Sequence, residues 1–374
     1  MKVVMLSKAL VVGAYQKKLE ELARLPNIEL TALVPPCWRE PGVGRLPLER
    51  RFSRGYRLEQ LPILLNGQHH LHFYPGLRRV LERERPTVLH IDEESFNLAT
   101  FLALRAGRAV GARCCFFNWA NIDRRYPPPF SWFESYAFRH AAYAIAGNQE
   151  AAAILRRHGY RGPVAVLPQF GVDPDLFSPA ELGATNDAAS TFVIGYVGRL
   201  VAAKGILDLV EALAGLPEPA RLRLVGDGTL RPAIIERVST LGLKERVELL
   251  PVVSSMEVPN VLRQLDVLVL PSHTTPSWKE QFGRILIEAM SCAVPVIGSS
   301  SGEIPHVIGD AGLVVPEQDV GALREALLTL MHDPEQRRML GQKGRERVLA
   351  HYTQASLARS YYNVYRIMSG PDEA

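Results

Sequence analysis

The chain has 374 residues, of which 47% are hydrophobic and 22% are charged, and its formal net charge is +4. This length exceeds one ordinary hydrophobic core, so we expect two domains of similar size. The composition excludes a collagen-like or largely disordered protein, and no apolar run approaches the roughly 18 residues that a membrane span requires.

The first half of the sequence alternates between short apolar runs and helical patterns. A predicted strand at 3–6 is followed by a loop with Gly13 and then by a helical pattern through Leu19, Leu22 and Leu25. Further strands are predicted at 28–34, 88–91, 113–117, 142–146 and 164–167. This alternation predicts a parallel sheet that helices cover on both faces. The opening residues are typical of a first strand rather than a signal peptide, so we expect a cytoplasmic protein.

The polar, irregular stretch from Ser178 to Thr191 interrupts this alternation, and we interpret it as an inter-domain linker. A second series of elements follows it. We predict strands at 192–197, 221–225, 247–250, 267–270, 294–298 and 313–315, and helices at 206–213, 230–241, 258–265, 284–291, 321–331 and 335–350. The prediction is therefore two doubly wound α/β domains, over residues 1–180 and 190–355, with a ligand cleft at the carboxyl ends of their strands.

Cysteine and histidine spacing gives no sign of a metal site. The four cysteines form no C-x-x-C pair, so we expect them to be reduced packing residues. His69, His70 and His72 form the only histidine cluster, but it has no cysteine or well-spaced carboxylate beside it. A polar loop is the better interpretation, and we assign no metal.

Two carboxylates, Glu280 and Glu288, flank an otherwise apolar stretch. If a helix begins near Gly283, Glu280 lies in the loop before it and Glu288 lies inside it, with Cα atoms at most about 12 Å apart. One elongated polar ligand could contact both. The alternative is an acid at a helix N-terminus and a second acid in solvent. Hydrolysis by paired acids is disfavoured, because retaining glycosidases hold their two carboxylates about 5 Å apart.

The first strand of the second domain ends in Gly198-Arg199, and Lys204-Gly205 follows. A strand end that leads into a helix offers backbone N–H groups, and two cations beside it suit a pyrophosphate. The alternative is two cations on a solvated loop, but Gly198 favours a ligand because a residue without Cβ allows close backbone approach. The next strand ends in the glycine turn 226–228, which is weak evidence by itself.

Two common nucleotide-binding motifs are missing from the sequence. No G-x-G-x-x-G follows the first strand of either domain, and there is no G-x-x-x-x-G-K-[ST]. A nicotinamide-dependent oxidoreductase and a P-loop phosphotransferase therefore lose their main support.

The ordered combination of these motifs resembles the nucleotide-sugar-dependent glycosyltransferases of family 4. The matching segments are Gly198-Arg199, Lys204-Gly205, 225–228, 266–272, Glu280 to Glu288 and 295–298. The resemblance covers about residues 192–350, whereas the first domain matches mainly in its alternation. It implies the GT-B architecture, with two Rossmann-like domains facing a central cleft, a donor site mainly in the second domain, and a last helix at about 356–370 returning to the first.

The resemblance also implies roles for individual residues. Arg199 and Lys204 would hold the donor diphosphate, and Glu280 would bind hydroxyls of the donor sugar; these three are the catalytic candidates. The other donor-binding candidates are Glu288 for the ribose, the backbone at Gly198, Phe282 and Gly283, the backbone near Val253 for the base, and Gly13 near the diphosphate. Transfer in this family retains the anomeric configuration and needs no divalent cation, and the sugar nucleotide is a co-substrate, so no cofactor is expected.

The first domain would bind the acceptor, and its candidates stand at strand ends. Asn118 follows a predicted strand at a position where many relatives have a histidine that faces the donor sugar. His90, Glu93 and Glu94 end another strand, and each could contact acceptor hydroxyls. An ordinary surface role is the alternative for each of them.

The two halves of the chain differ in charge. Residues 1–185 carry 24 Lys/Arg and 17 Asp/Glu, a net +7, whereas residues 186–374 carry 19 and 22, a net −3. Within the basic half, the segment Arg39–Arg57 interleaves arginines with apolar residues in one flexible stretch, which suits a phosphorylated acceptor or an anionic membrane. A solvated loop is the alternative. Trp132, Phe133, Tyr136 and Phe138 could extend such a patch, although core packing is the alternative for most of them.

We therefore predict a glycosyltransferase that moves a sugar from a nucleoside diphosphate to a hydroxyl acceptor, including lipid-linked or phosphorylated ones, at or near the cytoplasmic face of a membrane. Nucleic acid is disfavoured as a partner, because no reading module joins the arginines and the second domain is acidic. Two alternatives stay open: another GT-B activity, such as a nucleotide-sugar epimerase or phosphorylase, and a non-catalytic nucleotide-sugar-binding subunit. The sequence leaves the donor base, the sugar and the acceptor undetermined.

Overall fold

A computed structural model of the protein describes residues 1–40, 44–180 and 191–370. The chain forms two compact units, Met1–Gly171 together with the segment that starts at Gln354, and Val172–Thr353. The expected linker, Ser178 to Thr191, falls largely on residues 181–190, outside the described ranges. The division comes earlier, at Gly171, because the carbonyl groups of Phe177 and Ser178 already accept hydrogen bonds from Ser291 and Arg263 of the second unit.

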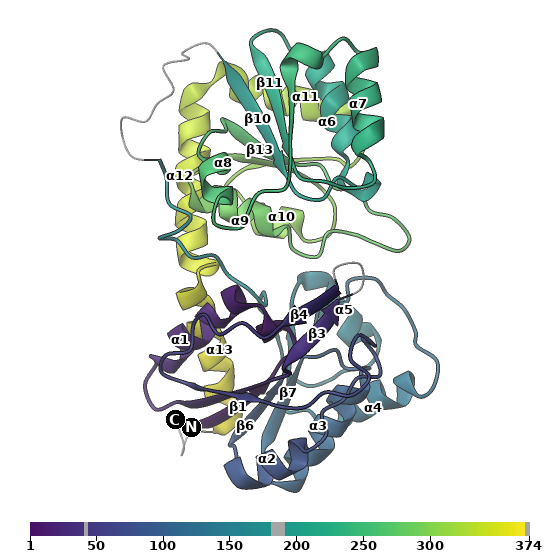
Figure 1. Cartoon of the computed structure of the whole chain (residues 1–374), viewed down its shortest axis with the longest axis vertical. Helices are drawn as coiled ribbons and strands as arrows, with labels where there is room; N and C mark the ends of the chain where they lie inside the picture. The colour runs from purple at the N-terminus through teal and green to yellow at the C-terminus, as the bar shows by residue number, and fades with distance from the viewer. Residues whose placement is uncertain (41–43, 181–190, 371–374) are drawn as a thin grey trace. The chain divides into compact units, whose positions relative to one another are not determined.

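The first unit is built on a seven-stranded parallel sheet with the order β5-β2-β1-β6-β7-β8-β9 (Figure 1). Its strands are β1 (Lys2–Leu6), β2 (Glu29–Val34), β5 (Arg57–Gln60), β6 (Val88–Ile91), β7 (Arg113–Asn118), β8 (Tyr143–Ala146) and β9 (Val164–Val166). Its helices are α1 (Lys17–Ala23), α2 (Leu77–Glu84), α3 (Leu98–Ala109), α4 (Phe130–His140), α5 (Gln149–Arg157) and α13 (Gln354–Ser369), with the short 3-10 helices η1 (Ala9–Val11) and η2 (Gly13–Gln16). The direction in which strands are added reverses between β1 and β6.

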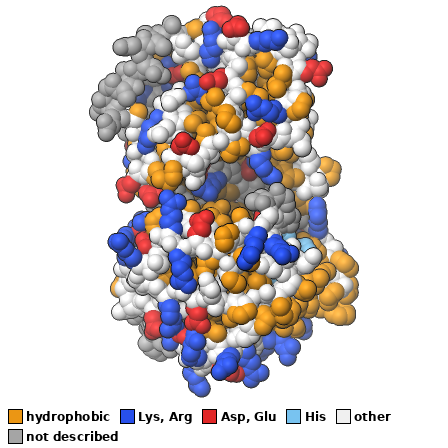
Figure 2. Space-filling view, viewed as in Figure 1, with side chains coloured by type: hydrophobic (Ala, Val, Ile, Leu, Met, Phe, Trp, Pro, Cys, Tyr) orange, Lys and Arg blue, Asp and Glu red, His pale blue; other side chains and the backbone are white. Residues whose placement is uncertain are grey.

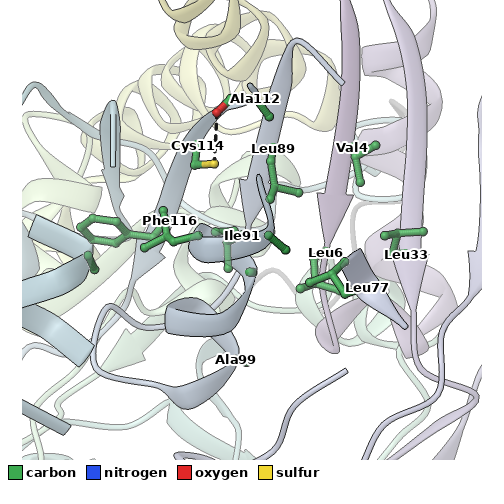
Figure 3. Packing of buried hydrophobic residues seen from close by; sticks show 14 of the residues in the cluster. Val4, Leu6, Leu33, Leu77, Leu89, Ile91, Ala99, Ala112, Cys114 and Phe116 are labelled. Atoms are coloured by element: carbon green, nitrogen blue, oxygen red, sulfur yellow. Dashed lines mark hydrogen bonds between the residues drawn. The ribbon is translucent and has the colours of Figure 1, made fainter. Parts of the chain in front are cut away.

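Helices pack on both faces of this sheet. On one face, Leu77 of α2 and Ala99 of α3 join strand residues such as Leu89 and Phe116 in one apolar cluster (Figure 3). On the other face, α1 packs with α13, which contributes the fully buried Tyr361 and Tyr365. Because the central strands are buried on both faces, they appear in the sequence as continuous apolar runs, which is why they were predictable.

The second unit repeats this plan with a six-stranded parallel sheet in the order β12-β11-β10-β13-β14-β15. Its strands are β10 (Phe192–Val197), β11 (Ala220–Val225), β12 (Val247–Leu250), β13 (Val267–Leu270), β14 (Val296–Ser299) and β15 (Leu313–Val315). Its helices are α6 (Ile206–Ala214), α7 (Arg231–Thr240), α8 (Val258–Leu262), α9 (Arg284–Ser291), α10 (Ile304–Ile308), α11 (Val320–His332) and α12 (Pro334–His351), with the 3-10 helices η3 (Ala202–Lys204) and η4 (Lys244–Arg246). Here the strand order reverses between β10 and β13, and the predicted α/β class with two Rossmann-like units is confirmed.

Residues 38–58 differ most from the prediction of a flexible segment. They include β3 (Cys37–Glu40) and β4 (Gly44–Pro47), which pair as an antiparallel hairpin, and the start of β5. Trp38 stands opposite Leu46, and Arg39 stands opposite Arg45. Within β3 and β4, the alternation of apolar and basic residues is therefore the two-residue period of a strand, with Trp38 buried in the core of the unit. Residues 48–56 belong to no helix or strand, as the prediction of a loop requires.

Helix α4 gives a mixed result for the predicted aromatic patch. Tyr136 and Phe138 pack against the core, whereas Trp132 is 66% exposed. None of the described helices combines the length and the apolar character that crossing a membrane would require.

Candidate functional site

The loops after β10 and β13 meet at the carboxyl edge of the second sheet, where the strand order reverses. The backbone N–H of His273 donates to the carbonyl of Ala203 at 2.8 Å, and the His273 ring lies 2.6 Å from the Asp208 carboxylate. Gly205 has φ +65°, and a Cβ at this position would lie 1.9 Å from the carbonyl oxygen of Pro271. Only glycine permits this approach, which holds the neighbouring Lys204 against the end of β13.

Lys204 and Glu280 form an ion pair at this meeting point, with side chains that are 15% and 10% exposed. The Ser272 hydroxyl donates to the same carboxylate oxygen, Oε2, at 3.0 Å. The Lys204 ammonium also lies 4.8 Å from the ring centre of Trp278, in the loop just before Glu280. The structure thus brings together two predicted residues and adds Ser272, which ends the matching segment 266–272 without an assigned role, and Trp278, which no motif in the sequence marked.

The loop after β14 fixes the backbone of Glu280. The N–H of Glu303 donates to the Glu280 carbonyl at 3.1 Å, and a Cβ on Gly302 would lie 2.0 Å from that same oxygen. Gly302 has φ +54°, so it satisfies both a backbone conformation and a close approach that a larger residue would resist. Glu280 is therefore held through its backbone and its carboxylate.

Arg199 lies on the same edge and is exposed. In the part of the chain that the structure describes, no acid forms an ion pair with its guanidinium, while its carbonyl accepts a hydrogen bond from the buried Tyr196 hydroxyl at 2.8 Å. The glycines nearby pack the loops together, since a Cβ on Gly226 would lie 1.9 Å from the carbonyl oxygen of Gly198. The 226–228 turn is thus explained by contact between two loops of the unit.

Helix α9 begins directly after Gly283, which has φ +77°. Glu288, one turn into α9, pairs with Arg284 at 2.7 Å, and burial raises the pKa of the Glu288 carboxyl, with Arg284 acting against that rise. Glu280 and Glu288 therefore have different cationic partners. Phe282 packs edge-on against Tyr352, with ring centres 5.8 Å apart. Val253 lies in the loop after β12, on the same edge of the sheet.

In the first unit, the N–H of Gly13 donates to the Glu49 carboxylate at 2.8 Å. A Cβ on Gly13 would lie 2.7 Å from that carboxylate oxygen, so the glycine is explained by this internal contact. The backbone N–H of Gly13, a residue that the resemblance places near the diphosphate, therefore has an acceptor inside the chain.

The acceptor candidates of the first unit, Asn118, His90, Glu93 and Glu94, occupy different environments. His90 is 1% exposed; its Nδ1 lies 2.6 Å from the Tyr365 hydroxyl, and burial lowers its pKa to about 3. The Asn118 side chain accepts from the N–H of Ser95 at 2.9 Å and is buried too. His90 faces the α13 core, and Asn118 fixes the loop after β6.

The buried Nε2 of His90 has no hydrogen-bond partner among the described residues, and Glu94 too has spare hydrogen-bonding capacity. Its Oε1 accepts from the N–H groups of Trp119 and Ala120, at 2.9 and 3.2 Å. Its Oε2 is buried and has no hydrogen-bond partner among the described residues. Burial raises the pKa of the Glu94 carboxyl to about 7, with the two backbone N–H groups and Lys8 opposing the rise.

A buried charge network beside Glu94 was not predicted. Glu93 pairs with Lys8 and lies 3.0 Å from Nε2 of His72. Burial would raise the pKa of Glu93, but Lys8 and His72 lower it to about 2. Asp92 accepts from the Gln169 amide at 2.8 Å, and burial raises its pKa. Lys8 and Glu93 stand 85 residues apart, so spacing in the sequence carries no signal for this pair.

The histidine cluster is divided among separate partners, since His72 binds Glu93 and His70 lies 3.1 Å from the Asn97 amide oxygen. Within residues 1–40, 44–180 and 191–370, no group of three or more His, Cys, Asp and Glu side chains is arranged to hold a metal ion.

Comparisons with known proteins identify the family. The family described as "Glycosyl transferases group 1" matches residues 182–347, and "Glycosyl transferase 4-like domain" matches residues 18–169. The chain is 30% identical over 305 residues to 2-deoxystreptamine N-acetyl-D-glucosaminyltransferase of Streptomyces fradiae, covering 72% of this chain and 71% of that protein. It is 31% identical over 177 residues to N-acetyl-alpha-D-glucosaminyl L-malate synthase of Bacillus anthracis, covering 46% of this chain but only 45% of that relative's length.

Among solved structures, Anabaena Alr3699/HepE in complex with UDP superposes with a TM-score of 0.71 at 18% identity, over 97% of this chain and 99% of that one. At this identity the likeness speaks for the fold alone. The two family matches and the Streptomyces relative go further: the chain belongs to the glycosyl transferases group 1 family and has the GT-B fold expected from its sequence.

Proposed function

We propose that the chain transfers a sugar from a nucleoside-diphosphate sugar to a hydroxyl group of an acceptor. The observation that carries the proposal is the cluster of Lys204, Glu280 and the exposed Arg199 where the strand order of the second sheet reverses. An ammonium and a guanidinium suit a diphosphate, and a held carboxylate suits sugar hydroxyls. Membership in the family supports the same class of reaction.

In this proposal the donor lies along the carboxyl edge of the second sheet. Arg199 and Lys204 bind the diphosphate, and Glu280 accepts hydrogen bonds from hydroxyls of the sugar. Glu288 binds the ribose, and backbone groups at Phe282, Gly283 and Val253 complete the contacts with phosphate and base. Lys204 is shared between Glu280 and the diphosphate, since its ammonium has three N–H donors.

The transfer step exchanges one bond for another at the anomeric carbon. The bond from this carbon to the diphosphate oxygen breaks, the acceptor oxygen forms the new bond on the same face, and the acceptor proton goes to the departing diphosphate. Negative charge grows on that diphosphate, and removing one preorganised donor such as Lys204 typically costs on the order of 100-fold to 1000-fold in rate. Because two side-chain cations supply this stabilisation, we propose retention of configuration without a divalent cation.

The comparisons suggest where to begin with the donor. The solved Anabaena relative is a complex with UDP, and two curated relatives are named for N-acetylglucosaminyl transfer. UDP-N-acetylglucosamine is therefore the first donor that we propose, ahead of other UDP, GDP and ADP sugars.

On the acceptor side, we propose that Glu94 binds an acceptor hydroxyl. Its Oε1 is fixed by two backbone N–H groups while its Oε2 has no hydrogen-bond partner in the described chain. We leave His90 and Asn118 out of the proposed site, because His90 is 1% exposed and contacts Tyr365 in the core, and Asn118 binds Ser95.

The test has two stages. Thermal unfolding with UDP, GDP and ADP sugars should show a higher midpoint with the true donor, since a ligand that binds only the folded state stabilises it. Release of the nucleoside diphosphate is then measured with lipid and soluble acceptors, with and without EDTA. We expect release only when an acceptor is present, and no loss in EDTA.

Each other outcome has a definite meaning. Interconversion of sugars without an acceptor would identify an epimerase, and tight donor binding without turnover on any acceptor would identify a binding subunit. If no sugar nucleotide shifts the unfolding midpoint, the proposal is wrong.

A further inference from the structure

The surface beside the β3–β4 hairpin contains two arginines placed directly opposite each other. Arg39 of β3 pairs in register with Arg45 of β4, and both side chains are exposed. In the described chain neither forms an ion pair, and the neighbouring Glu40 accepts a hydrogen bond from the Trp38 indole at 2.8 Å. Like charges directly opposite on a hairpin destabilise it. A bound anion would offset the repulsion between the two guanidinium groups, and the described residues supply none.

An exposed apolar turn adjoins the arginine pair. The Asn66 side chain accepts from the N–H of Arg39 at 2.8 Å and donates to the carbonyl of Cys37 at 3.0 Å, which joins the turn to β3. We call the leucines of this turn and its continuation the leucine edge: Leu64, Leu65 and Leu71, which are 51%, 52% and 39% exposed. Figure 2 shows that, on the face of the first unit turned to the viewer, blue and pale-blue side chains lie next to a broad orange area.

Leu65 has a backbone conformation that is unfavourable for a leucine. Its φ is +54°, a left-handed conformation that glycine and asparagine adopt easily and that a leucine resists. Half of its surface is exposed, so burial in the unit does not offset the cost. Neither the conformation nor the packing of the folded chain favours a leucine at this position.

We propose that the arginine pair and the leucine edge together dock this unit on an anionic lipid bilayer. A soluble phosphate would satisfy the two guanidinium groups but would leave the leucines in water. A bilayer satisfies both, because lipid phosphates lie just above the acyl carbons into which short apolar side chains insert. The net charge of +7 over residues 1–185 has the sign that attraction to such a surface requires.

This docking surface lies outside the proposed donor site, and its test uses no sugar nucleotide. Binding of the full chain is measured by flotation with phosphatidylcholine vesicles, with and without phosphatidylglycerol, at low and high salt. We expect binding only to the anionic vesicles, and weaker binding at high salt. A donor assay that fails would therefore leave this result unaffected, and the reverse also holds.

The first experiment tests the arginine pair with two double variants that have the same net charge. Arg39→Gln with Arg45→Gln should weaken vesicle binding about 25-fold, since each basic residue near an anionic surface contributes about fivefold. Its thermal midpoint should stay the same or rise, because the repulsion is removed. The control is Arg79→Gln with Arg113→Gln, two exposed arginines elsewhere on the same unit. An equal loss in the control would show that net charge alone drives binding and would overturn the proposal.

The second experiment tests the leucine edge with a variant that should lose vesicle binding without losing stability. Leu65→Asn should keep or raise the thermal midpoint, because asparagine tolerates the left-handed conformation, and should lower vesicle binding at least about fivefold. Ile367→Ser is the matched control, since Ile367 is 65% exposed on α13 of the same unit. Three results would each overturn the proposal: no binding by the wild type, unchanged binding by Leu65→Asn, or stabilisation by inorganic phosphate without any vesicle binding.

Discussion

The two sheets carry the same pair of charges at the same topological position. In the first unit Lys8 follows β1 and pairs with Glu93 after β6, and in the second Lys204 follows β10 and pairs with Glu280 after β13. Each pair joins the two strands between which the strand order reverses. The loops that converge there bring distant charges together in both units.

The difference lies in what surrounds each pair. Glu93 is fully buried and is also contacted by His72, by the Tyr74 hydroxyl at 3.4 Å and by the Asn97 amide at 3.3 Å. The second pair shares its edge of the sheet with Arg199, which is exposed. The topology gathers charge at both edges, and the cation left without an internal acid decides which edge suits an anionic ligand.

The largest expected effect concerns the ion pair of the first unit, Lys8 and Glu93. Lys8→Met leaves Glu93 charged and buried, so we expect the free energy of unfolding to fall by about 3–5 kcal/mol. Denaturant unfolding at pH 7 measures this, with Lys343→Met on α12 as the exposed control. A change under about 1 kcal/mol would mean that the two pairs do not differ in the way described.

In the second unit, loss of a cation should lower the rate of sugar transfer. Lys204→Ala or Arg199→Ala should lower kcat by about 100-fold to 1000-fold, because the leaving diphosphate loses a preorganised donor. Steady-state kinetics measure the effect, and Lys343→Ala is the control. A change in donor affinity with an unaltered kcat would place these cations in ground-state binding and remove their catalytic role.

The Glu94 carboxyl should make the free energy of unfolding depend on pH. Its pKa rises from 4.5 to about 7 on folding, so the folded chain holds more protons than the unfolded chain between these values, and stability falls as pH rises through that window. Glu94→Gln removes this dependence and should be more stable than the wild type at pH 8 by on the order of 1–3 kcal/mol.

Unfolding of both proteins at pH 5 and pH 8 provides the measurement for Glu94. Equal slopes with pH in the wild type and the variant would show that Glu94 ionises normally. Its proposed contact with an acceptor hydroxyl would then lose the support of an unusually placed carboxyl.

The smallest effect is expected at Glu288. Glu288→Gln keeps the shape of α9 but weakens contact with the ribose, so the donor KM should rise about tenfold while kcat changes little. Arg284→Gln, which removes the ion-pair partner of Glu288, is the control. If Arg284→Gln raises KM as much, Glu288 acts by anchoring the helix.

The strands that are most buried were the easiest to predict from the sequence. The fully buried strands β6 and β13 were predicted at their observed bounds, because burial on both faces leaves an unbroken apolar run. The β3–β4 hairpin was missed, since its alternation of Trp38 and Leu46 with Arg39 and Arg45 was taken for the composition of a loop. The predicted helix at 258–265 is also shorter in the structure, where α8 ends at Leu262.

The site was partly predictable for a similar reason. Arg199, Lys204 and Glu280 lie in loops that directly follow strands, so their order along the chain carried the signal. Trp278 and Gly302 were not marked, because their roles depend on a ring beside Lys204 and on a carbonyl of another loop. The surroundings of His90 were not predictable in this way: it lies near the end of β6, but α13 supplies its neighbour Tyr365 from 275 residues away.

The assignment of α13 to the first unit affects how the chain is made. Tyr361 and Tyr365 fill the core of that unit, yet they belong to α13, which leaves the ribosome only after the whole second unit. A nascent chain that has released only residues 1–171 lacks these rings and exposes the apolar groove of α1 that they cover. We therefore expect the first half to be protease-sensitive until α13 has been synthesised, and a stop codon after α12 to damage the unit farthest from it in the sequence.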